Sequence, residues 1–139
     1  MLVTLKDVYK IYGEGLEGEV RALDGVSLEI DRGEFVAIVG QSGSGKSTMM
    51  NVLGCLDIPT RGEYLLDGTD VQELTDKELS RIRNKQIGFI FQQYNLIQSP
   101  SVLENVELPL IYQGIRADDR YDMAMEAMAR VGLANRVKH

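Results

Sequence analysis

The alternation of apolar and polar residues predicts an antiparallel β layer in the N-terminal part of the chain. Residues 2–12 and 26–30 have β character, and the second segment alternates apolar with polar residues, as a half-buried strand would. The glycine-rich residues 13–19 between them predict a flexible, hairpin-like insertion. Residues 64–66 show β character again before a turn at Asp67-Gly68. We therefore expect a small antiparallel layer formed by about residues 2–30 and 64–71.

Two unbroken apolar runs have a different pattern. Residues 35–39 read Phe-Val-Ala-Ile-Val, and residues 87–91 read Ile-Gly-Phe-Ile-Phe. Such runs are typical of strands that are buried on both faces of a parallel sheet. We interpret them as strands of a core formed by about residues 35–57 and 87–93. The predicted fold class is α/β, with the antiparallel layer beside this core.

Helix-start signals and helical spacing predict the later elements. Thr75–Glu78 and Ser101–Glu104 each have the sequence of a capping box, which opens a helix. Pro109 should kink the second of these helices or end it early. A last amphipathic helix is predicted from about Asp119 to Val131, with Gly132 as its C-cap. Its apolar side is expected to contain Met123, Ala127, Met128 and Val131. We assign about residues 101–139 to the start of a helical subdomain.

Composition limits the classes of function. A chain of 139 residues with 44% apolar residues suits one domain. The net charge of −6 and the lack of a Lys/Arg cluster argue against a nucleic-acid partner. The single cysteine, Cys55, cannot form an internal disulfide and indicates a reducing compartment such as the cytoplasm. The sequence shows no signal peptide and no membrane span, so any membrane role is expected to be peripheral.

Residues 40–48 read Gly-Gln-Ser-Gly-Ser-Gly-Lys-Ser-Thr, the complete G-x-x-x-x-G-K-[ST] pattern of a P-loop. Glycines let successive backbone N–H groups point into one concavity that holds phosphate, with the positive end of the next helix behind it. Lys46 supplies a mobile charge for the β- and γ-phosphates, and the Ser47 hydroxyl can ligate Mg²⁺. The predicted nucleotide-binding residues in this loop are Gly40, Ser42, Gly43, Ser44, Gly45, Lys46, Ser47 and Thr48.

Other P-loop classes fit less well. GTPases need an Asp-x-x-Gly for the γ-phosphate and an Asn-Lys-x-Asp for guanine, and neither string occurs in the sequence. The nearest string, Asn84-Lys85-Gln86-Ile87, has an apolar residue in place of the guanine-binding carboxylate. Small-molecule kinases remain possible, but the chain after residue 100 contains no Arg-rich lid segment.

At Phe91-Gln92-Gln93-Tyr94-Asn95-Leu96 the sequence resembles the ATP-binding subunits of ABC transporters. The resemblance runs from Leu5-Lys6-Asp7-Val8 through Leu53–Asp57 to Glu104–Leu110, and these strings look most like the macrolide-export and lipoprotein-release branch. It implies that Gln92 is the Q-loop glutamine, which reaches Mg²⁺ and the attacking water. Gln93 is the alternative.

The same resemblance implies an aromatic residue upstream of the P-loop that stacks on adenine. Tyr12, just before the glycine-rich insertion, occupies that place, and Tyr9 is the alternative. Stacking on an aromatic ring would tolerate any purine.

Three family motifs do not occur in the sequence: a Walker B strand that ends in Asp-Glu, a Leu-Ser-Gly-Gly-Gln signature and a switch histidine. Tyr64-Leu65-Leu66-Asp67 comes closest to Walker B, but Gly68 replaces the catalytic glutamate, so we interpret this string as structural. We do not assign the switch role to His139. We therefore expect the chain to be the N-terminal part of a longer subunit, truncated within the helical subdomain and inactive as an ATPase by itself.

The resemblance implies ATP hydrolysis in the full-length parent, coupled to export or extraction of a substrate by a membrane permease. ATP and Mg²⁺ are the expected ligands, with Lys46 and Gln92 as catalytic residues and Ser47 and Gln92 at the metal. The expected partners are a transmembrane permease and a second copy of the ATP-binding subunit, at the cytoplasmic face of the cell membrane. Two alternatives stay open: nucleotide binding without turnover, and a non-transport ABC ATPase acting on DNA.

Overall fold

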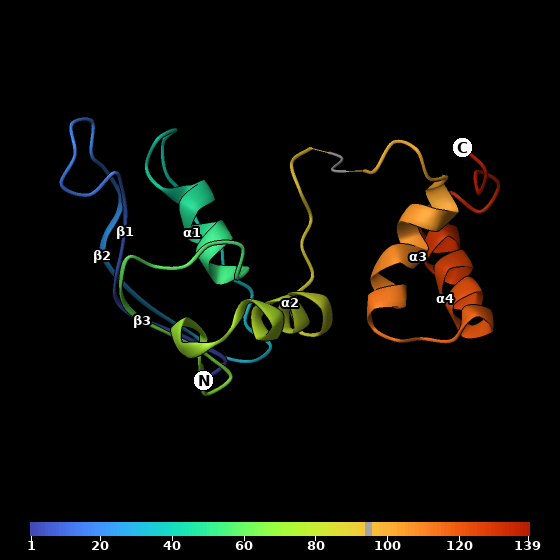
Figure 1. The fold of residues 1–139 in the computed structure, drawn as a ribbon, viewed down its shortest axis with the longest axis horizontal. Helices are drawn as coiled ribbons and strands as arrows, with labels where there is room; N and C mark the ends of the chain where they lie inside the picture. The colour runs from blue at the N-terminus through green and yellow to red at the C-terminus, as the bar shows by residue number, and fades with distance from the viewer. Residues whose placement is uncertain (94–95) are drawn as a thin grey trace. The chain divides into compact units, whose positions relative to one another are not determined.

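The computed structural model of the protein describes residues 1–93 and 96–139, and Figure 1 shows it as a ribbon. The chain divides into two compact units, Met1–Arg83 and Asn84–His139. The first unit is built on a β-sheet, and the second contains a pair of helices.

An antiparallel sheet with the strand order β2-β1-β3-β4 forms the first unit. Its strands are β1 (Val3–Tyr12), β2 (Val20–Ile30), β3 (Arg61–Leu66) and β4 (Thr69–Asp70). The central strand β1 places Leu5 opposite Leu28 of β2 and Tyr64 of β3. The structure confirms the predicted antiparallel pairing and the hairpin connection. β2 begins earlier than the predicted start at residue 26, because the ladder continues to the pair Tyr12 and Val20.

The core of this unit joins the sheet to helix α1 (Lys46–Leu53). Leu5, Val8 and Tyr64 of the sheet are no more than 1% exposed, and Val52 of α1 is 0% exposed. The Tyr64 hydroxyl donates a hydrogen bond of 2.7 Å to the carbonyl oxygen of Leu53, at the end of α1. Complete burial of an aliphatic or aromatic side chain contributes about 1.5–3 kcal/mol. These contacts therefore fix the helix that follows the P-loop.

Helix α2 (Asp76–Lys85) follows the short 3₁₀ helix η1 (Val71–Glu73) and begins as predicted. The Thr75 hydroxyl accepts a hydrogen bond from the Glu78 backbone N–H at 3.2 Å, and the Glu78 carboxylate accepts one from the Thr75 backbone N–H at 3.3 Å. These reciprocal bonds confirm the capping box. Leu79 and Ile82 are the buried residues of this helix.

In the second unit, helices α3 (Val102–Tyr112) and α4 (Ala117–Arg130) lie side by side, as Figure 1 shows. The capping box at Ser101 and Glu104 is confirmed, because each side chain bonds to the backbone of the other residue. Gly132 has a φ of 77° after α4, and the Leu133 N–H donates to the Met128 carbonyl at 2.8 Å. Val131 is the C-cap residue, and Gly132 lies one position beyond it at C′, so the glycine ends the helix as expected but occupies C′ and not the predicted C-cap position.

Two details of these helices differ from the prediction. α3 continues past Pro109 to Tyr112, and the Pro109 carbonyl still accepts a bond of 3.1 Å from the Gln113 N–H, so the predicted early end is wrong. The buried residues of α4 are Ala124 and Met128, one turn apart. Of the predicted apolar side, Met128 is buried, whereas Met123, Ala127 and Val131 are exposed. The buried stripe is narrow because α4 packs against a single helix of this unit.

The predicted strands at residues 35–39 and 87–91 are absent from the described residues, where both segments lack regular secondary structure. Phe35, Val39 and Ile90 are 97%, 86% and 99% exposed. A strand inside a sheet needs neighbours on both sides for its N–H and C=O groups, and no described strand pairs with either segment. This part of the prediction is wrong for this structure, and the assignment of residues 35–57 and 87–93 to one core stays a prediction.

Candidate nucleotide site

The backbone of the P-loop depends on its glycines. Gly43 and Gly45 have φ values of 83° and 96°, in the region that other residues rarely adopt. A Cβ atom on Gly45 would lie 2.4 Å from the Ala22 carbonyl oxygen, a backbone atom of β2. The loop therefore has this shape because the sequence provides glycine at these positions.

The Lys46 ammonium lies inside this loop. Its Nζ donates hydrogen bonds to the carbonyl oxygens of Gly40 and Gln41, the second at 2.9 Å. The Ser44 backbone N–H donates to the same Gln41 carbonyl at 3.1 Å. The loop thus curves around a single positive charge, at the place where a P-loop is expected to hold phosphate.

The N-terminus of α1 is open for an anion. Gly45 is the N-cap residue, and in this described segment no side chain caps the helix and no acidic residue occupies its first turn. The first N–H groups of a helix have no partner within the helix, and the helix dipole favours negative charge at this end. Ser47 and Thr48 lie in this first turn, and the exposed Ser47 side chain leaves its hydroxyl oxygen accessible to a metal ion. The residues present therefore fit a Mg²⁺-bound polyphosphate.

Two tyrosines of β1 were considered for stacking on the base, and their surroundings differ. Tyr12 ends the strand, and 43% of its surface is exposed. Tyr9 is less exposed: the Arg61 guanidinium lies 5.5 Å from its ring centroid, and a Cβ on Gly25 would lie 3.0 Å from its hydroxyl. Tyr9 therefore has a packing role, and Tyr12 is the better candidate for a ligand.

Lys10 and Asp57 contact the Tyr12 side chain. The Lys10 Nζ lies 5.3 Å from the Tyr12 ring centroid, and the Tyr12 hydroxyl donates to Asp57 Oδ2 at 3.3 Å. Burial raises the pKa of the Asp57 carboxyl, but hydrogen bonds from Lys10 and from the Ile58 backbone outweigh this effect and lower the pKa below its ordinary value. Asp57 therefore remains charged at neutral pH. Sequence reasoning missed both residues, although Asp57 ends one of the strings that carry the family resemblance.

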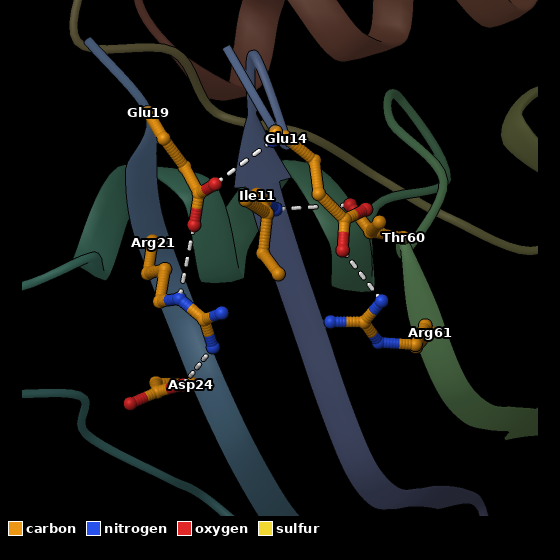
Figure 2. Close-up of polar contacts among 8 residues, drawn as sticks. Ile11, Glu14, Glu19, Arg21, Asp24, Thr60 and Arg61 are labelled. Carbon is orange, nitrogen blue, oxygen red and sulfur yellow. Dashed lines mark hydrogen bonds and ion pairs between the residues drawn. The ribbon is translucent and has the colours of Figure 1, made fainter. Parts of the chain in front are cut away.

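Figure 2 shows the polar contacts that hold the hairpin turn between β1 and β2. Glu14 pairs with Arg61 of β3 at 2.5 Å, and Glu19 accepts a hydrogen bond from the Gly15 backbone N–H at 2.9 Å. This backbone bond, together with Arg21, lowers the pKa of the Glu19 carboxyl. The insertion at residues 13–19, which we predicted to be flexible, is thus tied to β3 by Glu14 and to β2 by the ion pair of Glu19 with Arg21 at 3.1 Å.

The two glutamines of the predicted Q-loop belong to the second unit, and both are exposed. Tyr94 and Asn95 of the same string lie outside the described residues. The phosphate loop and the surroundings of Tyr12 both belong to the first unit, whereas the role of Gln92 stays a prediction. The Walker-B-like string lies in β3 and the following turn, where Asp67 pairs with Arg32 at 2.5 Å, which agrees with a structural role.

Residues 23–139 match the family described as ABC transporter, and the chain belongs to this family. Over 138 residues it is 56% identical to the macrolide export ATP-binding/permease protein MacB of Hyphomonas neptunium, covering 99% of this chain and 21% of that protein. An uncharacterized ABC transporter ATP-binding protein of Thermotoga maritima is 50% identical, with 99% of this chain and 58% of that protein covered.

A solved structure, the dimeric post-hydrolysis state of the ATP-binding cassette MJ0796 bound to ADP and Pi, matches with a TM-score of 0.89 and 47% identity. The match covers 99% of this chain and 60% of that one. The chain thus spans about three fifths or less of the length of these relatives. These matches confirm the α/β ATPase fold class and the resemblance to the macrolide-export branch. Among the described residues, no helix is both long and apolar enough to cross a membrane.

Proposed function

We propose that this chain forms the phosphate- and base-binding part of an ATPase that powers transport of a substrate by a membrane permease. The observation that carries this proposal is the glycine-dependent loop that encloses the Lys46 ammonium at the open N-terminus of α1. A glycine-rich loop with a cation at a helix N-terminus is suited to bind phosphate groups. The family membership supports ATP as the nucleotide.

Each residue of the site then has a defined part. Lys46 and the backbone N–H groups of residues 40–48 hold the phosphates, and Ser47 and Gln92 are ligands of Mg²⁺. Tyr12 stacks on the base. Mg²⁺, when bound, neutralises charge that develops on the transferred phosphoryl group. Phosphoryl transfer requires little covalent chemistry from the protein. These residues therefore contribute to catalysis mainly by positioning the reacting groups and by neutralising charge.

The proposed partners are a transmembrane permease and a second ATP-binding subunit. The names of the relatives support both, because MacB is an ATP-binding/permease protein and the MJ0796 cassette is dimeric. With these partners the site would lie at the cytoplasmic face of the membrane. A second candidate function is nucleotide binding without turnover, which is favoured because the sequence contains the P-loop but neither a Walker B strand ending in Asp-Glu nor the signature motif.

Titration calorimetry tests the proposal directly. The full-length gene product should bind Mg-ATP, and Lys46→Ala should weaken this binding, whereas Lys77→Ala, at an exposed lysine of α2, should not. Equal affinity in all three proteins would contradict the proposal. Phosphate release by the same proteins distinguishes hydrolysis from binding alone.

A further inference from the structure

We propose that Lys10 and Asp57 form a positioning pair that holds the Tyr12 ring ready to receive the nucleotide base. The inference rests on the proposed function, in which Tyr12 stacks on that base. It extends the site by two residues that lie on separate elements of the first unit, β1 and the segment after α1.

The first contact is on the face of the ring. Lys10 and Tyr12 are two positions apart on β1, so their side chains point to the same side of the strand. The Lys10 Nζ lies 5.3 Å from the Tyr12 ring centroid, within the range of about 6 Å for attraction between a cation and an aromatic face. The ammonium therefore restrains the ring from one side.

The Lys10 ammonium is itself fixed. It donates to Asp57 Oδ1 at 2.8 Å and to the Ile58 carbonyl oxygen at 2.9 Å, and only 15% of its side chain is exposed. A lysine at a protein surface is usually free to change rotamer. Here two acceptors hold the charge beside Tyr12.

Asp57 is also fixed, and it reaches the tip of the ring. Its Oδ1 accepts from the Ile58 N–H at 2.8 Å, and its backbone N–H donates to the Asn51 carbonyl of α1 at 3.2 Å. Its Oδ2 accepts the Tyr12 hydroxyl proton at 3.3 Å, which is longer than the usual O–H···O distance of about 2.7–2.8 Å. The carboxylate therefore orients the hydroxyl, while the ammonium gives the firmer restraint.

Together these contacts connect the two ends of the proposed site. α1 begins in the phosphate loop, and Asp57 follows its C-terminal end and restrains Tyr12. With 43% of its surface exposed, the Tyr12 side chain remains open to a ligand. An aromatic ring that is already oriented loses less conformational freedom when a base stacks on it, so the pair should strengthen the base contact and not the phosphate contact.

The test measures the base contact separately from the phosphate contact. Binding of ADP and of inorganic pyrophosphate is measured by calorimetry with Mg²⁺ on the full-length gene product, and the ratio of the two affinities gives the contribution of the nucleoside. Tyr12→Ala shows how much of this ratio depends on the ring. Asp57→Asn and Lys10→Met should each lower the ratio about threefold to tenfold, as expected from the loss of a hydrogen bond.

The ratio also separates positioning from simple charge or stability effects. Removal of the Asp57 charge would favour both anionic ligands alike, and partial unfolding would reduce the binding of both, so neither effect changes the ratio. Glu107→Gln is the matched control, because the Glu107–Arg120 ion pair has similar burial and lies in the second unit. This variant should keep the wild-type ratio.

The outcomes separate the two proposals. If Tyr12→Ala lowers the ratio but Asp57→Asn and Lys10→Met leave it within about twofold of wild type, the positioning role is overturned and base stacking stands. If Tyr12→Ala leaves the ratio unchanged, base stacking fails and the positioning role fails with it. If Asp57→Asn does not fold, Lys10→Met and Tyr12→Phe test the positioning role in its place. Tyr12→Phe keeps the aromatic ring but loses the hydroxyl contact with Asp57. It should therefore lower the ratio of affinities less than Tyr12→Ala does.

Discussion

The Lys46 ammonium donates a hydrogen bond of 2.9 Å to the carbonyl oxygen of Gln41, five positions earlier in the same loop. In this arrangement the loop uses its own carbonyl oxygens as partners for the cation. A bound polyphosphate would compete for the same charge, with stronger, charge-assisted hydrogen bonds. The affinity of the site for nucleotide should therefore depend on Lys46 more than on any other single side chain of the loop.

Lys46→Ala is expected to weaken ATP binding about tenfold to a hundredfold, which is the effect of losing a hydrogen bond to a charged group. The loop backbone should persist, because its shape depends on the glycines. Titration calorimetry measures the change. Affinity within about threefold of wild type, a difference below 1 kcal/mol, would remove Lys46 from the site.

Gln92→Ala in the full-length gene product should lower the hydrolysis rate about tenfold or more and change ATP affinity much less, because an interaction made mainly in the transition state affects kcat. The measurement is phosphate release at saturating Mg-ATP. Gln93→Ala is the matched control at the neighbouring exposed position. A larger loss of rate at Gln93 would show that the other glutamine has this role.

Tyr64→Phe should destabilise the first unit by about 1 kcal/mol, because the Leu53 carbonyl oxygen would lose its buried hydrogen-bond partner at the end of α1. Denaturant unfolding measures the difference in the free energy of unfolding. Tyr112→Phe, at a tyrosine that is 75% exposed, should be neutral. Equal stability of the Tyr64→Phe variant and the wild type would show that the bond adds nothing to the fold.

The lowered pKa of Asp57 predicts that part of the free energy of unfolding depends on pH. Its pKa is lower in the folded protein than its ordinary value of 3.8, so the charged form stabilises the fold. This contribution is complete above the unfolded value and is lost as the pH falls through the lower folded value. The difference in the free energy of unfolding between Asp57→Asn and wild type should therefore be largest at neutral pH and decrease as the pH falls from 3.8 through the lower folded pKa. A constant difference across this range would contradict the assignment.

Local sequence signals predicted the structure well where the partners of each segment lie close by in the chain. Thr75 and Glu78 form their capping box within one helical turn, and β1 and β2 are joined by a short insertion. The P-loop could also be recognised from the sequence, because its conformation depends on its own glycines. In contrast, Lys10 and Asp57 are 47 positions apart, and neither residue suggests by itself that it contacts Tyr12. Residues 35–39 have the composition of a buried strand, but a strand needs pairing partners that composition does not supply.

The last prediction concerns the 139-residue chain by itself. Phe35, Val39 and Ile90 are nearly fully exposed, and their segments have unpaired backbone groups among the described residues. Apolar segments with free backbone N–H and C=O groups tend to associate, so the isolated chain should be marginally stable and prone to aggregate. It should also show no ATPase activity above background and no ATP-dependent dimer, because the chain covers only 58% and 60% of two of its relatives and the family signature motif does not occur in it. Sedimentation and phosphate release with and without Mg-ATP measure these properties, and Phe35→Ser combined with Ile90→Thr should reduce the aggregation. A stable monomer with a cooperative melt, or steady hydrolysis that Lys46→Ala removes, would contradict the prediction.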